Sequence, residues 1–157
     1  MAENLTASSA SATMHTYLLY NAGTTELPTW KKLIDIKDFP AMGGSPEQIE
    51  TTTLSNEVST FVTGVQSMPT LEFLANYTVN GYKAVKALQD SAEVKQFALA
   101  FGKPASSSYG SLGVFKWAGQ VSTWLEGGGV NAAREMRISI SATTEVAFSE
   151  DTLTVTE

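Results

Sequence analysis

Residues 114–124 (VFKWAGQVSTW) and residues 134–148 (REMRISISATTEVAF) are the two stretches of sequence that decide the fold. Both alternate apolar with polar or small residues, and this period of two is typical of β-strands that bury one face. Residues 126–129 (EGGG) separate the two stretches and end the first strand. The residues expected to face inward are Phe115, Trp117, Gly119, Val121 and Thr123 from the first stretch, and Met136, Ile138, Ile140 and Ala142 from the second.

Shorter strand-like segments and one helical pattern surround this pair. Residues 80–90 (NGYKAVKALQD) place Tyr82, Val85 and Leu88 at three-residue spacing, which predicts a short helix with Asn80 as its N-cap. The other segments with strand character are 16–21, 30–36, 48–54, 70–76, 94–101 and 152–156. About seven to nine strands joined by turns predict a mainly β fold, an antiparallel β-sandwich or barrel with one short α-helix.

The length of 157 residues predicts one domain. Residues 1–13 (MAENLTASSASAT) are too small and polar to offset their ordering entropy, so we expect a flexible N-terminal arm before a single β domain at 14–157. This arm either has no role or orders against a neighbouring subunit. It lacks the basic start and apolar core of a signal peptide. No apolar run in the chain approaches the roughly 20 residues that span a bilayer.

Charge and composition exclude several classes of function. The net charge of −6 argues against a dedicated nucleic-acid binder, which needs basic residues to neutralise phosphates. Without cysteine, the chain has no disulfide, thiolate nucleophile or cysteine zinc site. The one histidine, His15, lies beside the arm, where a catalytic base would be poorly held. Acidic pairs such as Glu47 with Glu50 resemble ordinary solvated turns. We therefore expect no enzymatic activity, no cofactor and no metal.

Two features indicate surfaces that neighbouring subunits cover. Residues 55–68 (SNEVSTFVTGVQSM) form a long loop in which Phe61, Val62 and Val65 are apolar. A loop this long in a compact domain is usually functional or bound by a partner. The 114–124 strand carries a single charge, Lys116, so as a sheet edge it would invite aggregation unless another subunit covered it.

The order of these blocks resembles that of phage major tail proteins, the tube proteins of long, non-contractile tails. The resemblance covers roughly residues 15–148 and is one of block order rather than of a single motif. It begins with PAMGGSPEQIETTTL at 40–54, followed by the long polar loop with Gly64, the strand LEFLANY and a short helix. It ends with two long strands around a glycine turn, EGGGVNAAREMRISI.

The resemblance implies a structural subunit of a tail tube. Six copies would form a ring whose inner strands join into one barrel, and the rings would stack into a hollow conduit for genome delivery. The implied partners are other copies of the chain and the tail tip, tape measure and terminator proteins. Viral DNA would pass through without sequence-specific binding. The implied location is the virion tail, after synthesis in the cytoplasm of a host bacterium.

The resemblance and the residues themselves together suggest roles for individual side chains. The long loop would stack one ring on the next through the apolar side chains of Val58, Phe61, Val62 and Val65. Glu50 and Glu72 lie on the polar faces of two strands that we expect at the lumen, where negative charge repels DNA phosphates. Trp124, beside the three glycines, is the expected anchor of a subunit contact, because aromatic residues are enriched at interfaces.

Two alternatives remain open at the level of sequence. A carbohydrate- or receptor-binding β-sandwich module would need an exposed aromatic platform, for which Trp117 or Trp124 could serve. A tail terminator or completion protein of similar fold would form a single ring instead of a filament.

Overall fold

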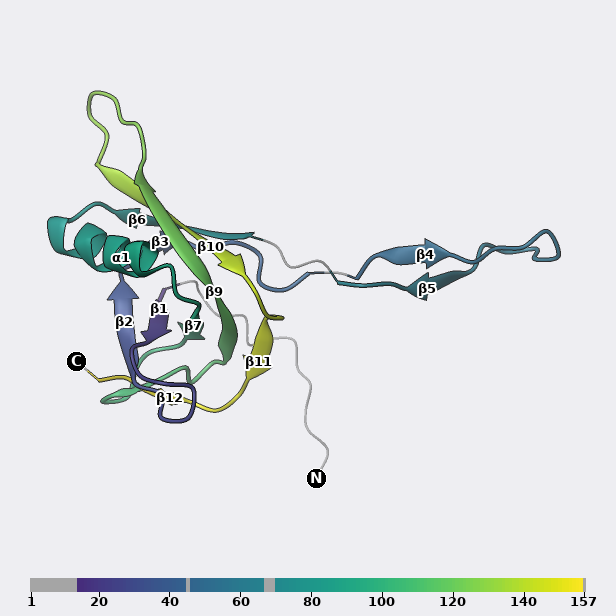
Figure 1. The fold of residues 1–157 in the computed structure, drawn as a ribbon, viewed down its shortest axis with the longest axis horizontal. Helices are drawn as coiled ribbons and strands as arrows, with labels where there is room; N and C mark the ends of the chain where they lie inside the picture. Colours follow the sequence, from purple (N-terminus) through teal and green to yellow (C-terminus); the bar gives the residue numbers. More distant parts are fainter. Residues whose placement is uncertain (1–13, 45, 67–69, 157) are drawn as a thin grey trace.

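The computed structural model describes residues 14–44, 46–66 and 70–156. Figure 1 shows a compact β body, one helix at its side, and a narrow hairpin that projects far from the body. The elements follow in this order: β1 Thr16–Asn21, β2 Trp30–Ile34, β3 Ile36–Asp38, β4 Gln48–Glu50, β5 Phe61–Thr63, β6 Thr70–Asn76, α1 Val79–Ser91, β7 Lys95–Phe101, β8 Ser108–Tyr109, β9 Val114–Leu125, β10 Glu135–Ala142, β11 Ala147–Ser149 and β12 Leu153–Thr154.

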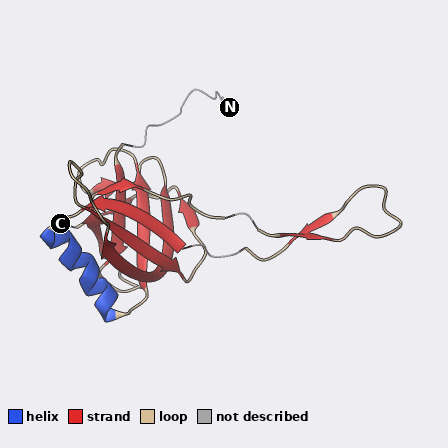
Figure 2. Cartoon of the chain, turned by 90° about the horizontal axis from the view of Figure 1, so that it is seen from above, coloured by secondary structure: helices blue, strands red, loops and turns tan. Residues whose placement is uncertain are grey.

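The main sheet is antiparallel and has the strand order β2-β1-β7-β9-β10-β6-β3, with β11 pairing a second part of β9. The prediction of a mainly β, antiparallel, sandwich-like fold with one helix is therefore confirmed. Strands β2 and β3 form the two ends of this order, yet only Asp35 separates them in the chain. The sheet must therefore curl until its ends approach, and Figure 2 shows the strands wrapped around a common interior.

The long strands predicted at 114–124 and 134–148 lie at the centre of this sheet. The first is β9, which pairs with β7 along one side and with β10 and β11 along the other. The expectation that it is an edge is wrong, because its own domain covers it. The second is two strands, β10 and β11, since the chain turns at Thr143 and Thr144. Thr143 donates its backbone N–H to the Ala118 carbonyl, and the Thr144 hydroxyl accepts from the Ala118 N–H at 2.8 Å.

The predicted inward faces of both strands form the main core. Trp117 and Phe73 stack with ring centroids 6.0 Å apart, and Phe97 stacks on the same indole with centroids 6.2 Å apart. All three side chains are buried. The rest of this cluster consists of Leu18, Leu33, Leu71, Ala75, Val85, Leu99, Val121, Met136, Ile138 and Ile140. Dense packing of this kind supplies most of the stability of a small β domain.

A second, smaller core lies on the opposite face of β1 and β7. It contains Leu19, Ala98 and Trp30, and the C-terminal segment closes it with Leu153 and Val155. This segment is tied down by a hydrogen bond from Thr156 N to the Trp30 carbonyl, and by β12 pairing with β8. The short strand predicted at 152–156 is thus confirmed, and it covers apolar surface that the sheet would otherwise expose.

The predicted helix is α1, but its N-cap is Thr78 rather than Asn80. The Thr78 hydroxyl accepts a hydrogen bond from Gly81 N at 3.1 Å, which places the cap two residues earlier. Gly81 allows the helix to approach β2, because a Cβ there would lie 2.7 Å from Ile34 Cδ1. At the other end of the helix, the Gln89 side chain accepts from Thr123 N and fastens α1 to β9.

The segment from 46 to 66 departs most from the prediction. The strand expected over 48–54 is only three residues long, and the loop expected over 55–68 contains β5, which pairs with β4. Together they form a hairpin separate from the main sheet. The arm expected at 1–13 lies outside the described residues.

Candidate subunit interface

The hairpin of β4 and β5 is the most unusual feature of the described structure. Its ladder pairs Gln48 with Thr63, Ile49 with Val62, and Glu50 with Phe61. A ladder of three residue pairs is short, and an isolated two-stranded hairpin is at best marginally stable in water. Figure 1 shows no other element beside it. Such a hairpin gains stability when a partner covers one of its faces.

Beyond the ladder, threonine and asparagine hold the hairpin together. Thr51 donates its N–H to the Thr60 carbonyl at 2.8 Å, and the two side-chain hydroxyls lie 3.0 Å apart. At the tip, Asn56 accepts from Thr53 N and Thr53 Oγ1 through its side-chain oxygen. These polar contacts explain why the many threonines here specify a defined shape without a core.

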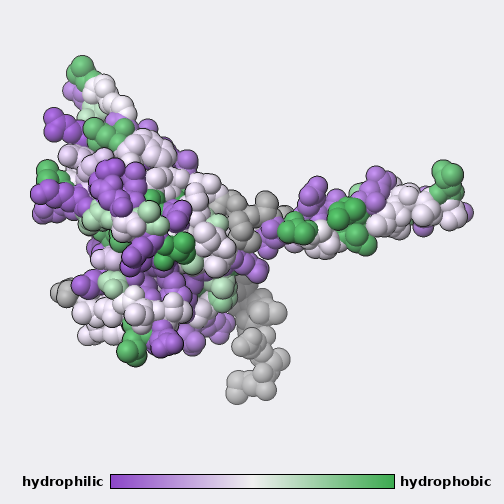
Figure 3. Space-filling view, in the orientation of Figure 1, coloured by the Kyte–Doolittle hydropathy of each residue, from purple (hydrophilic) through white to green (hydrophobic). Residues whose placement is uncertain are grey.

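The predicted stacking residues all lie in this hairpin, and all are exposed. The exposed fractions are 75% for Val58, 54% for Phe61, 50% for Val62 and 87% for Val65. Figure 3 shows the resulting apolar patches along the hairpin. Because directly opposite residues share a face, Phe61 lies with Glu50 on one face and Val62 with Ile49 on the other. The structure thus divides the predicted set between two faces.

Sequence reasoning missed two further exposed apolar residues of the hairpin. Ile49 is 52% exposed and Leu54, at the turn, is completely exposed. Ile49 lies in the 48–54 segment, for which the sequence predicts a strand. The Thr51–Thr53 run with Asn56, typical of a turn held by side chains, is the signal that could have indicated a hairpin tip.

A polar face on the main sheet is the second candidate surface. The residues of β9, β10 and β6 that point away from the core align in rows across the three strands. One row joins Ser122, Ser139 and Glu72, and the next joins Gln120, Ser141 and Thr70. This face is mostly neutral, with short side chains. Glu72 lies on this face, whereas Glu50 lies in the hairpin, so the two residues expected at the lumen do not share a sheet.

Trp124, the predicted anchor, belongs to a charged network at one end of this face. Its indole Nε1 donates to Glu126 Oε1 at 3.0 Å, and Arg137 Nε donates to the same oxygen at 2.7 Å. Arg137 also reaches Glu72 at 3.4 Å. Trp124 is 40% exposed. The network holds an aromatic side chain in a fixed orientation while leaving part of its surface available to a partner.

The hydrogen bond from Arg137 holds the pKa of Glu126 below its ordinary value, against the opposing effect of burial, with Trp124 adding a second hydrogen bond. Because folding lowers this pKa, the ionised carboxylate stabilises the fold above the unfolded-state pKa, and the contribution is lost as pH falls through the folded value. Glu126→Gln is therefore expected to lower stability at neutral pH and to match the wild type in acid. Urea unfolding at about pH 7 and about pH 3 tests this. An equal difference at both pH values would contradict it.

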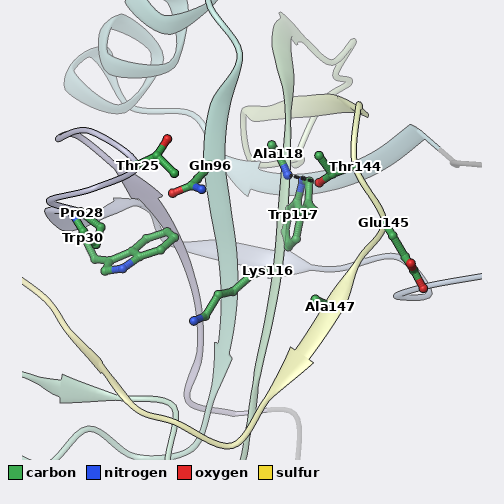
Figure 4. A pocket seen from close by; sticks show the side chains of 10 residues that line it. All are labelled: Thr25, Pro28, Trp30, Gln96, Lys116, Trp117, Ala118, Thr144, Glu145 and Ala147. Atoms are coloured by element: carbon green, nitrogen blue, oxygen red, sulfur yellow. Dashed lines mark hydrogen bonds between the residues drawn. The ribbon is translucent and has the colours of Figure 1, made fainter.

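A groove of about 370 Å³ lies between the β1–β2 turn and the segment around β11. Figure 4 shows Pro28 and Trp30 on one side, Thr144, Glu145 and Ala147 on the other, and Lys116 between them. Trp30 is 7% exposed and Trp117 is 3% exposed, so neither presents a flat ring to a ligand. Trp117 is therefore wrong as the aromatic platform of a carbohydrate-binding module.

The described residues contain no group of three or more His, Asp or Glu side chains that could hold a metal ion. His15 is exposed, and its ring Nδ1 lies 3.4 Å from the Tyr17 hydroxyl, which is not a catalytic arrangement. In the part of the chain that the structure describes, no helix has the length and hydropathy to cross a membrane.

Several solved structures from tails and contractile injection systems share this fold. A sheath/tube terminator from the PVC extracellular contractile injection system superposes with a TM-score of 0.70 at 10% identity, over 92% of this chain and 99% of that chain. The tail of an empty GTA particle gives 0.66 at 10% identity, over 89% and 99%. The PVC sheath-tube complex gives 0.65 at 10% identity, over 91% and 93%. At this low identity, the superpositions demonstrate a shared fold and nothing more. A scan against protein-family models and a search of curated proteins found no match.

Proposed function

We propose that the chain is a non-enzymatic structural subunit of a phage-type tail tube. The projecting hairpin carries the proposal, because it exposes apolar side chains on both faces of an element too small to be stable alone. Large exposed apolar surface usually marks a protein–protein contact. The fold shared with tube and terminator proteins supports the same role. In this proposal the hairpin, including Val58, Phe61, Val62 and Val65, stacks one six-membered ring on the next.

The polar face of β6, β9 and β10 is proposed as the wall of the conduit. The cation beside Glu72 on this face, Arg137, is already paired with Glu126 and Glu72, so it offers little to a passing phosphate. Each cation that pairs with a phosphate adds affinity, and a conduit must avoid this. Glu72 then contributes the repelling charge that was expected of a lumen residue, and Trp124 lies at the margin of the wall, where it would contact an adjacent subunit.

The second candidate function is a tail terminator, favoured by the terminator with a TM-score of 0.70 over nearly all of both chains. A terminator caps a tube as a single ring, whereas a tube subunit grows into a filament. The fold does not separate contractile from non-contractile tails, and assignment to a non-contractile tail remains part of the proposal.

Negative-stain electron microscopy of the purified chain over a concentration series separates these functions. Hollow tubes with a regular axial repeat are expected for a tube subunit. Discrete rings that do not lengthen would establish the terminator instead. A chain that stays monomeric throughout, and binds glycans on an array, would contradict both and favour a binding module.

A further inference from the structure

We infer that the hairpin of one copy docks on the β9–β10 loop of a second copy, with Phe61 entering a groove there and Glu50 meeting Arg134. This inference rests on the proposed function, which it deepens by naming the receiving surface. The hairpin and the exposed patches of the body have complementary chemistry, and the hairpin and the β9–β10 loop lie at different ends of the molecule.

The hairpin is acidic as well as apolar. Residues 46–66 contain Glu47, Glu50 and Glu57 but no lysine, arginine or histidine. Within the described residues, none of these three carboxylates has an ion-pair partner. The surface that receives the hairpin should therefore combine exposed apolar groups with an unpaired cation.

Two patches on the body pair large exposed apolar side chains. Leu112 and Phe148 form one, 60% and 59% exposed, but their groove is bordered by Glu150, which would repel the hairpin. At the other, Leu125 ends β9 and is 53% exposed, and Val130 follows in the connection to β10 and is 93% exposed. This second patch has Arg134, for which the described part of the chain offers no ion pair.

The second patch also contains a groove of suitable shape. A pocket of about 400 Å³ is lined by Leu125, by the small residues Gly128, Gly129, Ala132 and Ala133, and by Arg134. Glu126 borders it too, but Arg137 already compensates that charge at 2.7 Å. Small residues leave room for an inserted ring. The directly opposed Phe61 and Glu50 share one face of the hairpin, so both can engage this surface together.

The two surfaces lie on different sides of the molecule. Figure 1 shows the hairpin reaching to the right and the β9–β10 loop rising at the upper left, with the body between them. A chain therefore cannot place its hairpin in its own groove. A contact between two different patches is head-to-tail, and its repetition produces rings or open filaments rather than a closed dimer.

Disulfide trapping tests the contact directly, because the chain has no cysteine of its own. Thr63 lies on the Phe61 face of the hairpin, and Ala133 lines the groove. Full-length Thr63→Cys is mixed with full-length Ala133→Cys under mild oxidant, and a mixed dimer is expected because docking brings the two thiols within bonding reach. The matched control replaces Ala133→Cys with Ser111→Cys, at the rejected patch. The expected yield is about tenfold higher for the first mixture.

A charge exchange tests the role of Arg134. Arg134→Glu in the groove partner is expected to lower the yield of mixed dimer, and Glu50→Arg in the hairpin partner is expected to restore it. Restoration requires the two side chains to interact, which a folding defect in either variant would not produce.

The outcomes separate this inference from the function on which it rests. Preferential trapping at Ser111, or tubes that form without any trapping at Ala133, would overturn the receiving surface and leave the tube subunit intact. Chains that form neither tubes nor mixed dimers of any kind would overturn both.

Discussion

Tubes are expected to disappear when Phe61 and Val62 are both replaced with serine, while the folded body keeps its wild-type stability. The two side chains are about half exposed in the single chain, and they lie on opposite faces of the hairpin. Losing both from an assembled contact costs about 3 kcal/mol by apolar area. That corresponds to roughly a hundredfold in contact affinity. Replacing exposed residues should change the free energy of unfolding by only about 0.5 kcal/mol.

Sedimentation velocity measures this assembly, at a concentration where the wild type forms tubes. Val94→Ser is the matched control, because Val94 is 52% exposed on the body and Val62 is 50% exposed on the hairpin. The control should assemble normally. If the double variant still formed tubes with a normal axial repeat, the hairpin would not make the stacking contact. If Val94→Ser lost assembly to the same extent, the effect would come from replacing any exposed valine and would not be specific to the hairpin.

Phe73→Ala is expected to produce the largest loss of stability. Phe73 is fully buried and stacks on Trp117 at 6.0 Å in the centre of the main core. Replacing such a ring with alanine costs about 3–5 kcal/mol, because it combines lost burial with a cavity. A domain of this size has about 5–15 kcal/mol in total. The variant should therefore be close to unfolding, and it should be weak in assembly for that reason alone.

Urea unfolding, followed by tryptophan fluorescence, measures the effect. Leu54→Ala is the control, since Leu54 at the hairpin turn is fully exposed and its replacement should change stability by only about 0.5 kcal/mol. Phe73→Leu keeps most of the volume and should lose less than Phe73→Ala. If Phe73→Ala unfolded at the wild-type urea concentration, the stacked aromatic core would not be the main source of stability.

The sequence predicted the elements whose pattern depends on one buried face. The strand at 70–76 has the predicted bounds, and the inward residues of β9 and β10 form the main core. Alternation is a reliable signal here because each of these strands covers the same interior. It could not reveal which strands are neighbours, so β9 was mistaken for an edge although β7 and β10 flank it.

The sequence was least informative where the chain leaves the core. Residues 48–54 have the β-branched composition of a sheet strand, but β4 pairs only with β5, outside the main sheet. The apolar residues that the sequence indicated in the long loop are all exposed. Their division between two faces depends on the register of the hairpin, which periodicity alone does not fix. Arg134 had no sequence signal, because the groove that it lines exists only in the folded chain.

The three glycines 127–129 in the β9–β10 loop have a thermodynamic consequence. A Cβ at any of them would meet nothing within 4 Å, so the fold does not require glycine there for lack of space. Glycine has the greatest backbone freedom, and ordering each residue costs about 1–2 kcal/mol. Docking on this loop must overcome that entropy, so one contact between two subunits is weak. Growth then requires several contacts at once, which favours a slow nucleation step followed by rapid, cooperative elongation.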